Sequence, residues 1–245
     1  MNSTKSPRIL LVVTSHDRFG ETGKKTGYYL PEVSHPVARF RAAGFDVDFA
    51  SPKGGEAPVD PASVDRNDAD NRALLDDATL TAKLRSTKTP DDVRLAVANG
   101  EYDAIFFAGG MGTMWDFAQD ARLGDLASDL LAQGKVVAAV CHGPAALLSA
   151  KRDDGRWLVE GHTVAGFSNA EETAAGHDGT IPYHLETELA KRGATYVSAP
   201  VWQAKVVTSG RLVTGQNPAS AKGVADAVVS LLAPARAPAE RAAHA

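Results

Sequence analysis

Two neighbouring residues, Cys141 and His142, are the best candidates for chemistry in this chain. A cysteine thiolate is a strong nucleophile, and a nearby base or positive charge activates it. Cys141 is the only cysteine among the 245 residues, so no disulfide can form within the chain. A lone cysteine is most often a small buried apolar residue. The residues around Cys141 must therefore decide whether it is reactive.

The sequence around Cys141 predicts a nucleophile elbow, in which a strand turns sharply into a helix at the nucleophile. Residues 136–140 are apolar and mostly valine, which is typical of a strand buried on both faces of a parallel sheet. Gly143 and Pro144 follow, and proline suits the first turn of a helix. The thiol would then lie just before a helix N-terminus, which favours the thiolate. We therefore expect a nucleophilic Cys141 with a pKa well below its ordinary value of about 8.5.

A second glycine-rich turn, Gly109–Gly112, follows the mostly apolar residues 102–108, which we expect to form a buried strand. It lacks the spacing of both common phosphate-binding loops. The expected donors of an oxyanion hole facing the thiol are the backbone N–H groups of Gly110, Met111, Gly112 and His142. A simple tight turn explains the glycines equally well. Because the carboxyl ends of parallel strands share one edge, we expect this turn, the polar loop 15–27 and Cys141 to meet there.

The remaining residues alternate between strand and helix patterns, which is the pattern of an α/β protein. The expected strands are residues 8–15, 45–50, 102–108, 136–140, 196–198, 205–208 and 211–214. The expected helices are residues 30–44, 71–85, 90–98, 113–133, 182–192 and 217–232. We expect Pro36 to delay the regular part of the first helix to about His35, and Gly124 to interrupt the helix over 113–133.

These elements predict a single α/β domain over residues 1–245, with a mostly parallel, flavodoxin-like sheet sandwiched by helices. We expect its core over residues 8–232. Residues 233–245 are rich in alanine, proline and arginine and lack bulky apolar side chains, so we expect a disordered tail there.

The composition excludes several classes of function. The formal net charge is −4, from 26 basic and 30 acidic residues, which argues against a nucleic-acid partner. No apolar run approaches the roughly 20 residues that span a bilayer, so we expect no membrane partner. The N-terminal residues lack the apolar core of a signal peptide, and with one cysteine this predicts a cytoplasmic protein.

The histidines do not have the spacing of a metal site, and we expect no metal. The scattered ones are His16, His162, His177 and His184. His35 lies three residues after Glu32, a spacing that could share a metal. We prefer a role for His35 in bracing the turn around Glu32.

Four separated motifs resemble the ThiJ/PfpI superfamily, whose fold is that of the class I glutamine amidotransferases. They are Glu-Val-Ser-His-Pro at 32–36, Phe-Ala-Gly-Gly-Met-Gly-Thr-Met-Trp-Asp at 107–116, Ala-Val-Cys-His-Gly-Pro-Ala at 139–145, and Arg-Leu-Val-Thr-Gly-Gln-Asn-Pro-Ala-Ser-Ala at 211–221. They look most like the heat-shock chaperone-like branch called glutathione-independent glyoxalases, or glyoxalase III. The resemblance covers about residues 8–232. It departs at Met111, where relatives often carry histidine, which puts a side-chain contact to substrate in doubt but not a backbone donor.

This resemblance implies a role for each matching residue. Cys141 is the nucleophile, and Glu32 is the acidic residue that approaches its sulfur. Glu172 is the carboxylate that orients His142, with the adjacent Glu171 as a second choice. A carboxyl beside a thiolate is disfavoured in its ionised form, so Glu32 could hold and pass a proton. The resemblance also implies a homodimer and no cofactor.

Three functions remain open from the sequence. The first is a cofactor-free glyoxalase, in which the thiolate adds to a methylglyoxal-type 2-oxoaldehyde and Glu32 moves a proton through an enediol to give a 2-hydroxy acid, with deglycase activity as an offshoot. The second is a Cys–His–Glu amidase or peptidase that uses the same elbow. The third is a chaperone or a redox-stress sensor in which Cys141 is oxidised without turnover.

Overall fold

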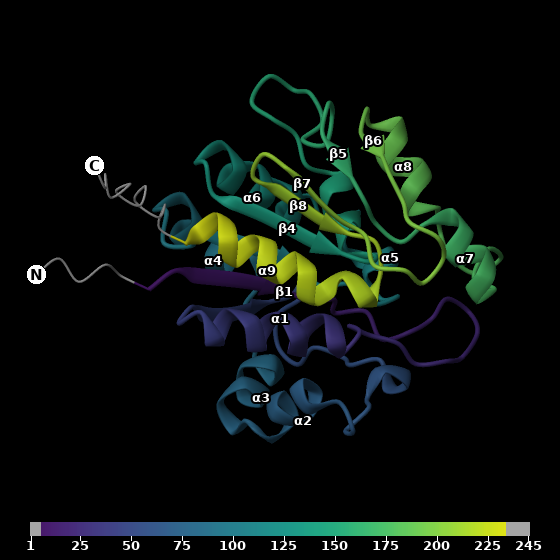
Figure 1. The fold of residues 1–245 in the computed structure, drawn as a ribbon, viewed down its shortest axis with the longest axis horizontal. Coiled ribbons are helices and arrows are strands. Elements are labelled where there is room, and N and C mark those ends of the chain that lie inside the picture. The colour runs from purple at the N-terminus through teal and green to yellow at the C-terminus, as the bar shows by residue number, and fades with distance from the viewer. Residues whose placement is uncertain (1–5, 234–245) are drawn as a thin grey trace, which may run out of the picture.

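Parallel strands form most of a six-stranded sheet in the computed structural model, which describes residues 6–233 (Figure 1). The strand order is β2-β1-β3-β4-β8-β7, and only the edge strand β7 runs antiparallel to its neighbour. The strands are β1 Arg8–Val12, β2 Asp46–Ala50, β3 Ala104–Phe107, β4 Val136–Val140, β7 Val206–Ser209 and β8 Leu212–Gly215. A separate pair consists of β5 Thr163–Val164 and β6 Thr195–Tyr196. Of the tail expected to be disordered, all but Ala233 lies outside the described residues.

Helices cover both faces of the sheet. Figure 1 shows α1 and α9 side by side across one face, with α2 and α3 outside α1. The α-helices are α1 Pro31–Ala42, α2 Ala69–Asp76, α3 Ala78–Arg85, α4 Pro90–Ala98, α5 Thr113–Asp116, α6 Ala121–Ala132, α7 Asn169–Ala175, α8 Leu185–Lys191 and α9 Ala221–Leu232. Short 3₁₀ segments are η1 Pro61–Ser63, η2 Gly143–Leu148 and η3 Pro218–Ser220. Among the described helices, none has both the length and the apolar character that crossing a bilayer requires.

The alternation of side chains along each strand builds two cores. In β1, Ile9 and Leu11 face the core under α1 and α9, whereas Leu10 and Val12 face the core under α4 and α6. All four are fully buried, which explains why the strand patterns in the sequence were continuously apolar. The predicted α/β fold, a mostly parallel sheet flanked by helices, is confirmed.

The expectation that Pro36 delays the first helix is wrong. Helix α1 begins at Pro31, and Pro36 lies inside it. A proline in the second turn removes one backbone hydrogen bond. Burial of Val33, Val37 and Phe40 against the sheet outweighs that loss. Glu32 is therefore fixed in the first turn of a regular helix.

The expected break at Gly124 is also wrong. Gly124 lies inside α6, where a β-carbon would meet the backbone nitrogen of Ala150 at 2.7 Å, so the glycine allows close packing. The break falls at residues 117–120, because the Asp120 side chain accepts the backbone N–H of Arg122 and starts a new helix there.

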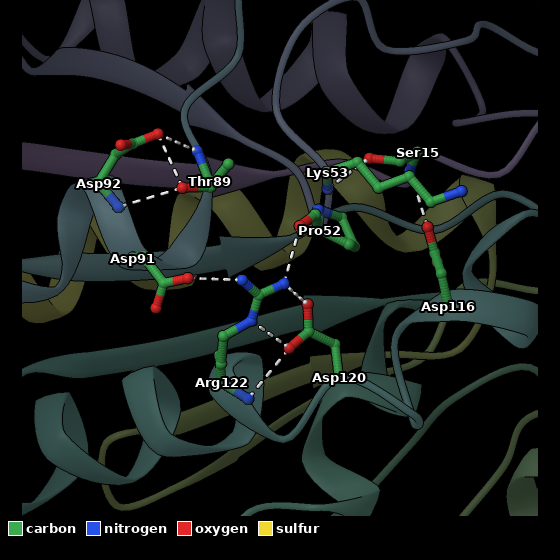
Figure 2. A network of polar contacts seen from close by, with 9 residues as sticks. All are labelled: Ser15, Pro52, Lys53, Thr89, Asp91, Asp92, Asp116, Asp120 and Arg122. Atoms are coloured by element: carbon green, nitrogen blue, oxygen red, sulfur yellow. Dashed lines mark hydrogen bonds and ion pairs between the residues drawn. The ribbon is translucent and has the colours of Figure 1, made fainter.

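A polar network ties the loops after β1 and β2 to α5 and α6 (Figure 2). Arg122 donates to Asp91 at 2.6 Å and to the carbonyl oxygen of Pro52 at 2.9 Å. Asp116 accepts the backbone N–H of Ser15 at 2.8 Å. Because the Arg122–Asp91 ion pair is partly exposed to solvent, it contributes little to the stability of the fold.

Candidate active site

A strained turn at the end of β4 presents Cys141. Its φ is 60°, a left-handed conformation that is uncommon for a residue with a side chain. The turn is held by its neighbours, because the Cys141 N–H donates to Gly215 at 2.9 Å and its carbonyl accepts from Phe167 at 2.8 Å. Gly143 must be glycine, since a β-carbon there would lie 2.2 Å from the carbonyl oxygen of Phe107. This is the geometry of a nucleophile elbow.

Glu32 is a fully buried carboxyl beside the thiol. The backbone N–H of Gly109 donates to its Oε2 at 2.8 Å, and a β-carbon on Gly109 would lie 2.5 Å from that oxygen. The other oxygen, Oε1, is buried and has no hydrogen-bond partner among the described residues. Burial raises the pKa of Glu32 to about 8, although Cys141 and the Gly109 N–H partly offset the effect. The carboxyl therefore carries a proton at neutral pH.

A row of polar contacts leads away from the thiol on the other side. His142 Nδ1 lies 3.3 Å from Cys141 Sγ, and His142 Nε2 lies 2.8 Å from Glu172 Oε1. The second oxygen of Glu172 lies 2.9 Å from Nδ1 of His177. Burial alone would raise the pKa of Glu172, but the two imidazoles lower it to about 2. Glu172 is therefore ionised and accepts a hydrogen bond from each histidine.

The expectation of a lowered thiol pKa is wrong. Burial raises the pKa of the Cys141 thiol, and the charge of an ionised Glu32 raises it further. The backbone N–H of His142 opposes this change but does not outweigh it. The segment after the elbow is a six-residue 3₁₀ helix, too short to supply the dipole of a regular α-helix.

The two adjacent glutamates of α7 point to different partners. Oε2 of Glu171 accepts from the backbone N–H and the hydroxyl of Ser168, at 3.0 and 2.9 Å. Its Oε1 accepts from the Trp202 N–H at 3.1 Å and from Asn217 Nδ2 at 2.8 Å. Glu171 thus holds the start of α7 and two distant loops, whereas Glu172 faces His142.

A cavity of about 320 Å³ opens onto Cys141 and His142. Its other lining residues are Tyr29, Asp60, Gly110, Met111, Phe167, Ala175, His177, Trp202 and Pro218. Of the four residues expected to supply oxyanion donors, Gly110, Met111 and His142 lie in its wall. Gly112 packs instead against the loop that follows β1, where a β-carbon would lie 2.5 Å from the His16 carbonyl oxygen. The cavity walls are mainly apolar, with few polar groups near the thiol.

Sequence reasoning missed several walls of this cavity. His177 was grouped with scattered histidines, although it follows Glu172 by five residues, just past the end of α7. Trp202, which the sequence predicts as a structural residue or a pocket wall, does line this cavity, half exposed and with a left-handed φ of 66°. Phe167 lies with its ring 4.3 Å from that of His142, and its place directly before the α7 motif was the available signal.

His35 does not join Glu32. Its Nε2 lies 2.9 Å from Asp68, and ligand atoms of His35, Asp68 and Asp70 all lie within 4.8 Å of one another. Lys222 already pairs with Asp70 at 3.1 Å. Glu32 and His35, three residues apart in the sequence, therefore have different partners: Glu32 bonds Gly109, and His35 bonds Asp68.

Comparison with known proteins identifies similar chains along nearly the whole length. A family model described as the DJ-1/PfpI family matches residues 25–231. The chain is 38% identical over 231 residues to the glutathione-independent glyoxalase HSP31 of Saccharomyces cerevisiae, covering 89% of this chain and 94% of that protein.

Two solved structures are also similar. The 24 kDa rapid encystment protein of Francisella tularensis has a TM-score of 0.87 and 39% identity, covering 92% of this chain and 98% of its own. Glyoxalase III of Candida albicans has a TM-score of 0.81 and 31% identity, covering 92% of this chain and 97% of its own. The range matched by the family model includes Glu32, Cys141 and Glu172.

Proposed function

This chain belongs to the DJ-1/PfpI family, as its motifs predicted, and we propose that it is a glutathione-independent glyoxalase. Its substrates are methylglyoxal-type 2-oxoaldehydes, its products are 2-hydroxy acids, and it uses no cofactor. The glyoxalases among its relatives support the reaction. The observation that carries the proposal is the buried, protonated Glu32 carboxyl beside the Cys141 thiol.

In the first step the thiol adds to the aldehyde carbon. His142 Nδ1, 3.3 Å from the sulfur, takes the thiol proton, and the thiolate forms a C–S bond with the aldehyde. The aldehyde oxygen receives the Glu32 proton, which gives a hemithioacetal and leaves Glu32 ionised. The backbone N–H groups of Gly110 and Met111 in the cavity wall are the candidate donors to the developing oxyanion.

In the second step Glu32 moves a proton between two carbons. Its carboxylate removes the hydrogen from C1, the C–H electrons form a C1=C2 double bond, and the C2 oxygen takes the proton from His142. The resulting enediol takes the Glu32 proton at C2, while the C1 hydroxyl returns its proton to His142. The product is a thioester of the 2-hydroxy acid, an isomer of the hemithioacetal. Water then hydrolyses the thioester. The leaving sulfur takes the proton of His142, and Glu32 takes the proton that the water releases, so both groups return to their starting states.

A carboxyl suits this task because one group must act as base and then as acid one atom away. Its pKa of about 8 lies near neutral pH, where a proton relay is most efficient. Deglycase activity on glycated adducts would use the same thiol and the same carboxyl.

A cysteine hydrolase is the second candidate. The distances of 3.3 Å from sulfur to His142 and 2.8 Å from His142 to Glu172 are those of a Cys–His–Glu triad. In an amidase or peptidase, His142 would protonate the leaving amine and Glu32 would have no defined task.

The two functions are separated by incubating the protein with methylglyoxal, without glutathione, and separately with peptide amides. We expect lactate from methylglyoxal and no amide cleavage. Cys141→Ala should form no lactate while keeping its circular dichroism spectrum and melting temperature. More than a tenth of wild-type turnover in that variant would remove Cys141 from the nucleophile role, and amide cleavage without lactate would favour the hydrolase.

A further inference from the structure

His177 extends the row of contacts that starts at the thiol. Its Nδ1 lies 2.9 Å from Glu172 Oε2, and His142 Nε2 lies 2.8 Å from Glu172 Oε1. The Glu172 side chain is completely buried between the two rings. Each oxygen of this carboxylate therefore has an imidazole as a partner, and the proposed chemistry gives no task to the second imidazole.

The position of His177 is set by the end of α7. The helix stops at Gly176, whose φ of 73° turns the chain back. The His177 N–H then donates to the Glu172 carbonyl at 3.0 Å. The N–H groups of Thr180 and Ile181 donate to the His177 carbonyl at 2.8 and 3.1 Å. The backbone of His177 is thus tied to the residue that its ring contacts.

A loop from a distant part of the chain holds the ring from outside. The ring of Phe19 packs edge-on against His177, with 5.2 Å between centroids. The His177 side chain is 21% exposed and lies in the wall of the cavity. The orientation of the imidazole is therefore fixed: its Nδ1 faces Glu172, and the side chain also forms part of the cavity wall.

The ionised carboxylate defines the protonation of both rings. Because Glu172 can only accept, His142 must carry its N–H on Nε2 and His177 on Nδ1. In neutral His142, Nδ1 is then an acceptor directed at the Cys141 sulfur. A second donor also spreads the carboxylate charge over two partners, which weakens its attraction for a His142 imidazolium.

We propose that His177 is a positioning residue, which holds Glu172 so that His142 presents an unprotonated Nδ1 to Cys141. The charged groups around this row are Glu32 beside the thiol, Asp60 in the cavity wall, Asp178 at 3.8 Å from His184, and Glu171, which bonds Ser168 and Asn217. None of these hydrogen-bonds the Glu172 carboxylate. The expected effect on methylglyoxal turnover rests on the proposed glyoxalase function, whereas the expected effect on alkylation of the thiol does not.

Two variants separate the hydrogen bond from the bulk of the ring. His177→Leu removes the donor and keeps a side chain of similar size, whereas the amide nitrogen of His177→Asn can replace Nδ1. Loss of a donor to a buried carboxylate should lower kcat for methylglyoxal about tenfold in His177→Leu. The KM should change less than kcat, and His177→Asn should recover most of the lost turnover.

The pH dependence of iodoacetamide alkylation gives a readout that does not require turnover. Without His177 the Glu172 charge acts on His142 alone, so it favours a positive charge on that ring more strongly, and a positive charge beside the sulfur stabilises the thiolate. The alkylation midpoint should move about one pH unit lower in His177→Leu and stay at the wild-type value in His177→Asn. His184→Leu is a matched control in the same loop, and it should change neither measurement.

The outcomes are distinct. A midpoint within 0.2 pH units of wild type in His177→Leu, or equal losses in the Leu and Asn variants, overturns the proposal. A shifted midpoint in a protein that makes no lactate would sustain the role of His177 and refute the glyoxalase function instead. Melting temperatures of the variants identify any that fail to fold. If His177→Leu does not fold, a His177→Asn midpoint that differs from the wild-type value overturns the proposal.

Discussion

Glu171 and Glu172 are adjacent glutamates with different roles: Glu171 caps the start of α7, and Glu172 bonds His142. The capping role of Glu171 can be predicted from the sequence. Ser168 and Glu171 form a capping box, in which each side chain bonds the backbone N–H of the other. This Ser-x-x-Glu spacing assigns Glu171 to the helix start and leaves Glu172 for His142. The capping box was the overlooked signal that separates the two residues.

Matched glutamine variants should therefore affect different properties. Glu172→Gln replaces one acceptor oxygen by a donor, so one imidazole loses its partner and methylglyoxal turnover should fall by tenfold or more. In Glu171→Gln one of the two acceptor oxygens is replaced by an NH2 group, so one or more donors of Ser168, Trp202 and Asn217 lose their acceptor. We expect this loss to lower the free energy of unfolding by about 1–3 kcal/mol. Turnover at 25 °C and urea denaturation of both variants measure the two effects. The reverse pattern would contradict the assignment.

At the level of elements, the strands, the elbow and the helix over residues 90–98 could be predicted, whereas the start of the first helix and the break within residues 113–133 could not. A buried parallel strand is a continuous apolar run, and Cys141 ends such a run before Gly143, so the local sequence contains the turn. Pro36 and Gly124 carry strong local preferences against helix interiors. Both lie inside helices because the buried face of α1 and the close packing of α6 on Ala150 outweigh those preferences.

Of the site, only the residues that directly follow a strand could be placed from the sequence. Cys141, His142 and Gly110 follow strands that share one edge, so topology brings them together. Phe19 belongs to the polar loop 15–27, which was expected at this edge, and it contacts His177 there. The local sequence does not show where the loop that carries Trp202 folds back onto the cavity. The thiol pKa was predicted in the wrong direction for the same reason, since burial is a property of the whole fold.

For the whole molecule, a buried carboxyl links activity to stability. Glu32 has a pKa of about 8 in the folded protein and an ordinary value of 4.5 when exposed. Between these two values the folded state binds the proton and the unfolded state does not. The stabilisation is therefore complete below pH 4.5 and is lost as the pH rises through 8. A proton relay of this kind makes the protein less stable at alkaline pH.

Replacing Glu32 by glutamine removes this titration. The melting temperature of the wild-type protein should fall more between pH 5 and pH 8 than that of Glu32→Gln, by an amount that corresponds to a few kcal/mol. Asp116, whose pKa burial raises to about 6, contributes equally to both proteins and cancels in the comparison. Parallel melting curves at the two pH values would contradict a protonated Glu32 in the folded protein.

Turnover of methylglyoxal by Glu32→Gln, measured beside alkylation of its thiol, tests the central claim most directly. The glutamine keeps an acceptor for the Gly109 N–H but cannot relay a proton. The account predicts that turnover falls about a hundredfold or more, while iodoacetamide still alkylates Cys141. Near-normal turnover of 2-oxoaldehydes by this variant would contradict the mechanism and favour the hydrolase.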